Sequence, residues 1–384
     1  MKTLNDDRNI VINKYIYTFI LFIILLRKYM ISILRTDIPI GGFTSLLFYA
    51  SIGLLFIQFI IRKEHNIVEI VLFIISCVLY VFTREGSILA IILLAISVRD
   101  IDDSYIVKSY LLMNLVFIIF CILLGNVFPY IAQVPETHYR LIGETYVPRE
   151  TFGFANPNSV FLFSLSIYAA YIFLRFDDYN KYDRIILIIL TAFVYVQTMS
   201  RTGAVTIIGA LIFVEFLRAI DFRKHPIIAN SIKILPILFL FGSIAIGTVF
   251  SGMTIFNKLL ASRPSHWHAY LVESGKLFTL FGNKYDEAIK LAHPLDSSYI
   301  YILALLGIAS LVFFMYLIYK GLDIFIKNNQ KKYIAIVMIF LIYALAENIL
   351  LEAGYNFTIL ILIKHIINKN PGRFTFKEML SFRK

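Results

Sequence analysis

Long apolar runs alternate with short polar clusters along the whole chain. The runs come close to the ~20 residues that an α-helix needs to cross the ~30 Å hydrocarbon core of a bilayer, and clusters of Lys, Arg, Asp and Glu separate them. The first run begins near Ile10 and has no small-residue cleavage site, so we expect a retained helix rather than a removable signal. The pattern predicts about twelve transmembrane helices, near residues 12–27, 43–61, 67–83, 87–98, 109–129, 156–174, 185–199, 203–218, 234–250, 297–319, 333–349 and 353–367.

The composition favours the same class of protein. Hydrophobic residues make up 59% of the 384 residues and charged residues only 16%, whereas soluble domains carry roughly 25% charged residues. A water-soluble fold could not bury this much apolar surface. We therefore expect an all-α polytopic membrane protein that forms a single integral membrane domain over residues 1–384.

The basic residues predict the sidedness of the chain. A net charge of +11 is compatible with nucleic-acid binding, but basic clusters between membrane spans more often reflect insertion orientation, so no nucleic-acid partner is expected. With both termini on the cytoplasmic side, most of the 36 Lys and Arg residues fall in the inner segments. The positive-inside rule therefore predicts cytoplasmic termini.

Two outer loops stand out on this topology by their length, about 130–155 and about 251–296. Inner loops are short and look like connectors. Long loops are uncommon in compact domains unless they are functional or disordered, and the second loop has the aromatic and apolar content of an ordered element. We expect function to reside in this loop, which lies between the ninth and tenth predicted helices.

The second outer loop is predicted to contain an amphipathic helix. Pro264 suits its first turn and Gly282 its C-terminal stop. Two placements stay open, on the outer leaflet or packed over the bundle of spans. The residues at helical spacing are Trp267, Tyr270, Leu271, Ser274, Phe278 and Phe281.

The two cysteines carry no chemical signal. Cys77 and Cys121 both lie within apolar runs. They suggest neither a disulfide framework nor a metal site, and we interpret both as packing residues.

Histidines and arginines gather on the predicted outer side. The guanidinium of arginine can donate two parallel hydrogen bonds to one phosphate, so arginines near the outer interface are suited to bind the diphosphate of a lipid. The alternative is that each one snorkels or pairs with a nearby glutamate. The outer residues are His138, His266, His268, His293, Arg84, Arg140, Arg149, Arg201 and Arg263, and the glutamates are Glu85, Glu144 and Glu150.

Arg201 is the hardest of these to explain as a surface charge. It lies in TMSRTGAV, at a tight junction between two apolar runs, where an unpaired charge is costly. Upstream, RETFGFANPNSV begins a span with Asn156, Pro157 and Asn158, and the free amides of helix N-termini attract anions. An asparagine that caps a helix needs no substrate, so this second motif is ambiguous on its own.

His293 is the candidate for acid–base chemistry. It precedes a span, with Asp296 and Tyr299 close behind it. A neutral imidazole at the water interface can take a proton from an attacking sugar hydroxyl. The alternative is that His293 is only a solvated polar residue in front of a helix.

The order of these motifs resembles that of the Wzy polysaccharide polymerases and WaaL O-antigen ligases. In this chain the order is NPN at the start of a span, SRTG at a hairpin, an Arg followed by a Trp-containing segment and FG, and a His before a span that ends in a Gly-Ile pair. The family's large outer loop typically carries an Arg near a Trp, an FG turn and an H-x-x-N/D-x-Y pattern. Here the loop motifs correspond to Arg263, Trp267, Phe281 with Gly282, and His293 with Asp296 and, one residue beyond that spacing, Tyr299. The resemblance covers about residues 149–308. Ligases commonly have Asn where this chain has Asp296, which weakens a shared role at that position.

The resemblance implies a membrane glycosyltransferase of the bacterial cytoplasmic membrane that uses no metal or other cofactor. It would polymerise undecaprenyl-diphosphate-linked repeat units of a capsular, exopolysaccharide or O-antigen glycan at the outer face. His293 would be the general base, with Arg201, Arg263 and Arg149 on the diphosphate. The implied supporting residues are Asn156, Asn158, Asp296, Tyr299 and Trp267.

The same resemblance implies the partners of the protein. The implied partners are the lipid-linked oligosaccharide, membrane lipid, a flippase and a chain-length regulator. Glu347, Asn348 and Glu352 either line a lipid path or sit at the water boundary. The alternative functions are an O-antigen-type ligase that moves finished glycan to another acceptor, and a flippase or transporter. Paired halves with interrupted helices, typical of transporters, are not evident in the sequence.

Overall fold

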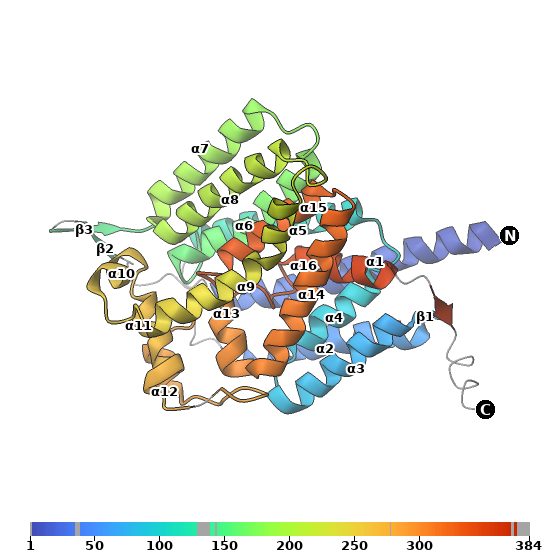
Figure 1. Ribbon diagram of the computed structural model, residues 1–384, viewed down its shortest axis with the longest axis horizontal. Helices are drawn as coiled ribbons and strands as arrows, with labels where there is room; N and C mark the ends of the chain where they lie inside the picture. The colour runs from blue at the N-terminus through green and yellow to red at the C-terminus, as the bar shows by residue number, and fades with distance from the viewer. Residues whose placement is uncertain are drawn as a thin grey trace. The chain divides into compact units, whose positions relative to one another are not determined.

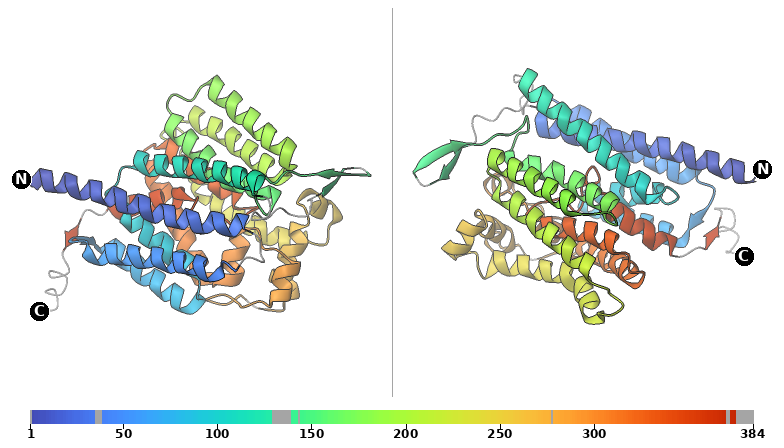
Figure 2. Two further views of the ribbon diagram at one scale, coloured as in Figure 1. Left: turned by 180° about the vertical axis from the view of Figure 1, so that it is seen from behind. Right: turned by 90° about the horizontal axis from the view of Figure 1, so that it is seen from above.

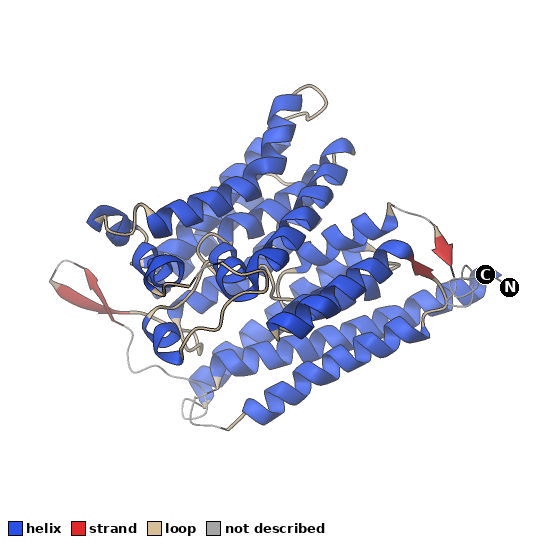
Figure 3. Cartoon of the chain, turned by 60° about the horizontal axis from the view of Figure 1, so that its bottom comes forward, coloured by secondary structure: helices blue, strands red, loops and turns tan. Residues whose placement is uncertain are grey.

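The computed structural model describes residues 2–34, 39–128, 139–142, 144–276, 278–369 and 372–374. These residues are helical almost throughout, with two short antiparallel strand pairs in the part described (Figure 3). The chain divides into two compact units. Unit 1 comprises Met1–Arg62, Leu93–Val214 and Ala353–Phe357, and unit 2 comprises Lys63–Ile92, Glu215–Glu352 and Thr358–Lys384.

Unit 1 is a set of long helices with one hairpin. Helix α1 contacts α2 and α5, α5 contacts α6, and α6 contacts α7 (Figure 2). The elements are α1 (Lys2–Ile33), α2 (Gly41–Ile61), the end of α4 (Ser87–Ser97), α5 (Asp103–Val127), β2 (Tyr139–Ile142), β3 (Thr145–Pro148), α6 (Pro157–Arg175), α7 (Lys181–Thr198) and most of α8 (Arg201–Ala219).

An aromatic cluster forms the core of unit 1. Tyr29 stacks on Phe117 with ring centroids 4.9 Å apart and lies 4.4 Å from Phe163, which stacks in turn on Phe154 at 5.0 Å. The Tyr29 hydroxyl donates to Asn114 Oδ1 at 3.1 Å. These contacts join α1, α5 and α6, because each helix contributes at least one ring or polar partner.

Unit 2 carries the long loop that follows α9. Helix α14 contacts α9, α15 and α3 (Figure 1). The elements are β1 (His65–Asn66), α3 (Ile67–Thr83), the start of α4, α9 (Pro226–Thr248), α10 (Thr254–Leu259), α11 (Arg263–His268), the π-helix η1 (Ala269–Glu273), α12 (Glu287–Ala292), α13 (Ser298–Tyr301), the π-helix η2 (Ile302–Leu306), α14 (Gly307–Lys327), α15 (Lys331–Tyr343), most of α16 (Phe357–Asn368) and β4 (Arg373–Phe374), which pairs with β1.

Seven helices in the described chain are long and apolar enough to cross a membrane, as expected of an all-α membrane protein. They are Ile10–Ile33, Gly41–Ile61, Asp103–Val127, Pro157–Arg175, Arg201–Ala219, Pro226–Thr248 and Ser298–Lys327. The other five predicted spans coincide with α3, α4, α7, α15 and α16. The predicted number of twelve spans is therefore not confirmed, because these five helices do not meet the same criteria of length and apolar content.

The predicted amphipathic helix is shorter than expected. It begins at Arg263 with Pro264 in the first turn, but its π-helical continuation ends at Glu273. Gly275 adopts a left-handed φ of +62°, a conformation that ends helices, so the prediction of a stop at Gly282 was wrong. Phe278 and Phe281 lie outside the helix.

Gly282 instead makes a close contact with the start of α14. A Cβ on Gly282 would lie 2.0 Å from the carbonyl oxygen of Leu305, and Gly282 (φ +84°) and Gly307 (φ +83°) both have left-handed backbones. The amide of Asn283 donates to the carbonyl of Ala304 at 2.9 Å. The FG turn therefore packs its backbone directly against the junction between η2 and α14, where only glycine fits.

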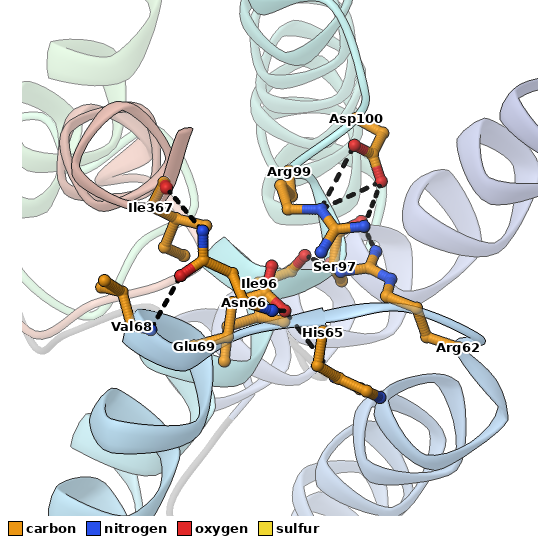
Figure 4. A network of polar contacts seen from close by, with 10 residues as sticks. All are labelled: Arg62, His65, Asn66, Val68, Glu69, Ile96, Ser97, Arg99, Asp100 and Ile367. Atoms are coloured by element: carbon orange, nitrogen blue, oxygen red, sulfur yellow. Dashed lines mark hydrogen bonds and ion pairs between the residues drawn. The ribbon is translucent and has the colours of Figure 1, made fainter. Parts of the chain in front are cut away.

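Two contacts within unit 2 join segments that the count of Lys and Arg residues predicts to lie on the same side of the membrane. Asn66 Nδ2 donates to the carbonyl of Ile367 at 3.3 Å, which joins the start of α3 to the end of α16 on the predicted inner side (Figure 4). On the predicted outer side, Phe82 stacks on Phe281 with ring centroids 4.2 Å apart. The side of the membrane on which each of these two groups of segments lies stays a prediction.

Candidate functional site

Arg263 joins three segments of unit 2 that are distant in sequence. Its side chain is 7% exposed. Its Nε donates to the carbonyl of Ala346 at 3.1 Å, and its Nη2 lies 3.1 Å from Glu347 Oε1 and 3.3 Å from Asp296 Oδ2. A buried guanidinium is thus bound by two carboxylates and one carbonyl, which satisfies a charge that would be costly alone.

The local sequence explains why Arg263 starts a helix at this point. Ser262 has a left-handed φ of +63°, so the chain turns sharply before α11, and Pro264 supplies the fixed φ of a first helical turn. Asn257 Oδ1 accepts the free amide of Ser265 at 3.1 Å. Trp267 is buried against α9, where a Cβ on Gly247 would lie 2.9 Å from the Trp267 Cβ.

The partner segment of Arg263 is non-helical backbone that follows α15. The helix ends at Tyr343, although the apolar pattern predicts that it continues to residue 349. Ser298 supports the segment: its Oγ donates to the carbonyl of Glu347 at 2.8 Å and accepts the amides of Ile349 at 2.8 Å and Leu350 at 3.2 Å. Irregular backbone among membrane spans is tolerated where protein satisfies its polar groups, and such breaks frequently form binding sites.

Two histidines form a pair next to this cluster. His266 Nδ1 and His293 Nδ1 are 3.3 Å apart, and the Tyr270 hydroxyl donates to the carbonyl of His293 at 2.8 Å. A hydrogen bond between two ring nitrogens requires one protonated and one unprotonated nitrogen, so the pair shares a single proton at this contact. Burial lowers the pKa of His266, and the charges of His293 and Arg263 lower it further, against the opposing effect of Asp296.

The two carboxyl partners of Arg263 hold protons more tightly than usual. Burial raises the pKa of Glu347 to about 8, and the neighbouring charge of Asp296 raises it while Arg263 lowers it. Burial also raises the pKa of Asp296, against the lowering effects of Arg263 and His266. One arginine cannot balance two carboxylates, so the cluster favours taking up a proton near neutral pH.

Tyr299 and Trp267 lie in the interior of unit 2. Tyr299 is fully buried, and its hydroxyl donates to the carbonyl of Leu341 at 3.1 Å, which ties α13 to α15. Trp267 is 3% exposed. Both side chains position the loop, because neither presents a solvated surface to a substrate.

His268 belongs to a separate contact within the same loop. Its Nδ1 lies 3.0 Å from the carbonyl oxygen of Gly247 and 2.9 Å from Ser251 Oγ. The ring is therefore bound to the end of α9, and it makes no hydrogen bond with the His266–His293 pair in the described chain. His138, the fourth predicted outer histidine, lies outside the described residues.

The other predicted site residues belong to unit 1 and form their own group. Arg149 Nε donates to the carbonyl of Thr198 at 2.6 Å, and its Nη2 donates to Asn158 Oδ1 at 2.9 Å. Asn156 caps α6, since its side chain accepts the amide of Asn158. The Asn-Pro-Asn motif thus begins the helix and also holds an arginine.

Three arginines lie close together in this group. Arg140 donates to the carbonyl of Met199, and Arg201 is the exposed first residue of α8. Burial lowers the pKa values of Arg140 and Arg149, and the charge of Arg201 lowers that of Arg140 further. Within the described residues, none of the three forms an ion pair with a carboxylate, so their charges are available to an anion.

Sequence reasoning missed several residues of the cluster around Arg263. The roles of His266, Glu347 and Ser298 in this cluster depend on long-range pairing, and the sequence singled out Glu347 only as a residue of a lipid path or of the water boundary. In the described chain, no group of three His, Cys, Asp or Glu side chains is placed to hold a metal ion.

Comparisons of the chain with protein-family models, with curated proteins and with solved structures found no match.

Proposed function

We propose that this chain polymerises polyprenyl-diphosphate-linked oligosaccharide repeat units at the outer face of a bacterial cytoplasmic membrane. The observation that carries the proposal is the grouping of Arg263, Asp296 and His293 in one loop after α9. These three residues are the charged and titratable positions of the loop motifs that resemble the Wzy and WaaL enzymes. The proposal rests on that resemblance together with the chemistry of this group.

In the proposed reaction, a sugar hydroxyl of the incoming unit attacks the anomeric carbon of the growing chain. His293 takes the hydroxyl proton, the new glycosidic bond forms, and the bond to the lipid diphosphate breaks. The contact between His266 and the Nδ1 of His293 leaves Nε2 to accept that proton. A general base of this kind contributes typically ~10²–10⁴-fold to the rate.

The leaving diphosphate needs positive charge, which the proposal assigns to arginines. The resemblance assigns Arg201 and Arg149 to this role, and neither forms an ion pair in the described part of unit 1. Arg263 is bound to Asp296 and Glu347, so a diphosphate would have to replace a carboxylate there. Protonation of Glu347, whose pKa burial raises to about 8, lowers the cost of that exchange.

The test is a reaction with purified protein in detergent and one lipid-linked repeat unit, followed by separation of the glycans by size. The wild type is expected to produce a ladder of products, and His293→Ala to lose it at unchanged protein abundance. His268→Ala is the matched control, since it removes the same side chain from the same loop but from a different contact. A ladder from His293→Ala would overturn the assignment of the base.

The same experiment separates the alternatives. A ligase would give no ladder but would transfer one glycan when a foreign acceptor is added. A flippase would form no glycosidic bond and would move the labelled lipid across the bilayer of a liposome. Either result would overturn the polymerase proposal.

A further inference from the structure

A groove in unit 2 lies between α3, α14 and α16, away from the cluster around Arg263. Its volume is about 440 Å³, within the ~300–1,000 Å³ typical of small-molecule and cofactor sites. Its walls are mostly apolar, with Val71 and Leu72 from α3, Phe313 and Leu317 from α14, and Ile366 from α16.

Helices α14 and α16 run in the same direction along the groove. A Cβ on Gly321 would lie 2.1 Å from Leu362 Cγ, and the rings of Phe325 and His365 are 5.1 Å apart. Successive contacts advance along both helices together, so the two C-terminal ends lie at the same end of the groove.

The start of α3 lies at this end as well. Asn66 accepts the amide of Val68 and donates to the carbonyl of Ile367 at 3.3 Å, which fixes the first turn of α3 to the last turn of α16 (Figure 4). Lys320, seven residues before the end of α14, and Lys369, just after α16, line the half of the groove toward this end, and the Lys320 ammonium lies 5.7 Å from the centre of the Tyr316 ring. The groove therefore has a cationic end, while its opposite end, toward Phe313, is apolar.

The acidic residue in the groove wall is already neutralised. Asp323 lies 3.1 Å from Lys233 Nζ and 2.7 Å from Lys327 Nζ. Lys320 and Lys369 form no ion pair within the described residues. Two positive charges thus remain at the mouth of the groove without a carboxylate.

The charge count predicts that this end faces the cytoplasm. Anionic lipids of the cytoplasmic leaflet attract basic residues by ~1 kcal/mol for each Lys or Arg near the surface, and basic pockets between spans bind anionic headgroups. An apolar slot with two lysines at one end matches an acyl chain that carries a phosphate at one end.

We propose that this groove is a binding site for an anionic glycerophospholipid. One acyl chain lies along Val71, Phe313 and Leu317, and the headgroup phosphate lies between Lys320 and Lys369. Lipid binding in this groove does not depend on the glycosyl transfer proposed above, so each proposal can be tested independently of the other.

The test counts lipids that stay bound to the whole protein in native mass spectrometry after purification in mild detergent. The probes are phosphatidylglycerol and phosphatidylcholine with the same acyl chains. Phosphatidylglycerol is expected to bind more tightly, and Lys320→Gln with Lys369→Gln is expected to weaken its binding about 30-fold, from ~1 kcal/mol per lysine.

Two further variants distinguish the contribution of the lipid headgroup to binding from that of the acyl chain. Arg223→Gln with Lys224→Gln is the matched control, because it removes two exposed charges from the same predicted side without touching the groove, and binding is expected to stay unchanged. Val71→Trp fills the groove from an exposed position and is expected to weaken binding of both lipids.

Three results would overturn the proposal. The first is equal retention of the two lipids, and the second is wild-type affinity in the double lysine variant. The third is displacement of phosphatidylglycerol by millimolar inorganic phosphate, which would mean that the lysines bind phosphate without any need for the acyl chain.

Discussion

Arg263 and Glu347 form a buried ion pair, with Nη2 and Oε1 3.1 Å apart, between the loop after α9 and the non-helical segment after α15. Asp296 lies 3.3 Å from the same nitrogen. Arg263 is therefore one of the residues that attach the loop with the predicted base to the bundle. The net charge of the cluster of Arg263, Asp296 and Glu347 depends on whether the two carboxyl groups are ionised.

The protonation of Glu347 should make stability depend on pH. Burial raises its pKa from the ordinary 4.5 to about 8, so between these values the folded state binds a proton that the unfolded state releases. The free energy of unfolding should fall as pH rises through this window. Thermal unfolding of Glu347→Gln in detergent, from pH 5 to 9, should show a weaker fall than the wild type.

A matched control for this variant is Glu273→Gln, which removes an exposed carboxylate from the loop after α9 that forms no ion pair with Arg263 in the described chain. It should keep the pH dependence of the wild type. Equal pH profiles for wild type and Glu347→Gln would contradict the assignment of a raised pKa to this carboxyl.

Ser298→Ala should destabilise the non-helical segment. The hydroxyl satisfies the amides of Ile349 and Leu350 and the carbonyl of Glu347, so its removal leaves buried polar groups unpaired at a cost of about 2 kcal/mol or more. Ser297→Ala is the control, since the Ser297 hydroxyl is buried and has no hydrogen-bond partner among the described residues. Limited proteolysis and thermal unfolding should rank Ser298→Ala well below Ser297→Ala, and equal stabilities would refute the role of Ser298.

Gly282→Ala should disrupt the contact between the FG turn and α14. The new Cβ would lie 2.0 Å from the carbonyl oxygen of Leu305, in a left-handed backbone that costs about 1–2 kcal/mol for an L-residue before any overlap is counted. Gly252→Ala is the control from the same loop, because nothing lies within 4 Å of its Cβ position. The expected result is a lower unfolding temperature for Gly282→Ala alone, and a normal one would show that the turn can move away.

His293→Gln should raise the pKa of His266. The positive charge of His293 is one of the causes that lower that pKa, after burial, and the substitution removes it. Nuclear magnetic resonance of protein labelled at histidine ring carbons would follow the titration in detergent. His268→Gln should leave the His266 titration in place, and an unchanged pKa in His293→Gln would show that the two rings do not interact in solution.

The sequence by itself determined the helical class and the positions of most helices. An apolar run of the right length satisfies its own backbone hydrogen bonds as a helix, so residues such as those of α2 and α3 need no distant partner to be recognised. It also singled out Arg263, His293 and Asp296, because charged and titratable residues beside a membrane span need an explanation.

Only the tertiary structure decided how these residues are paired. Glu347 lies in an apolar run that predicts a continuous helix, and neither Gly nor Pro marks the end of α15 at Tyr343. The break is stabilised by Ser298 and Arg263, which are distant in sequence. Hydrophobic periodicity reports a local preference, whereas the hydrogen bonds that replace a helix come from other segments and appear only when the chain has folded.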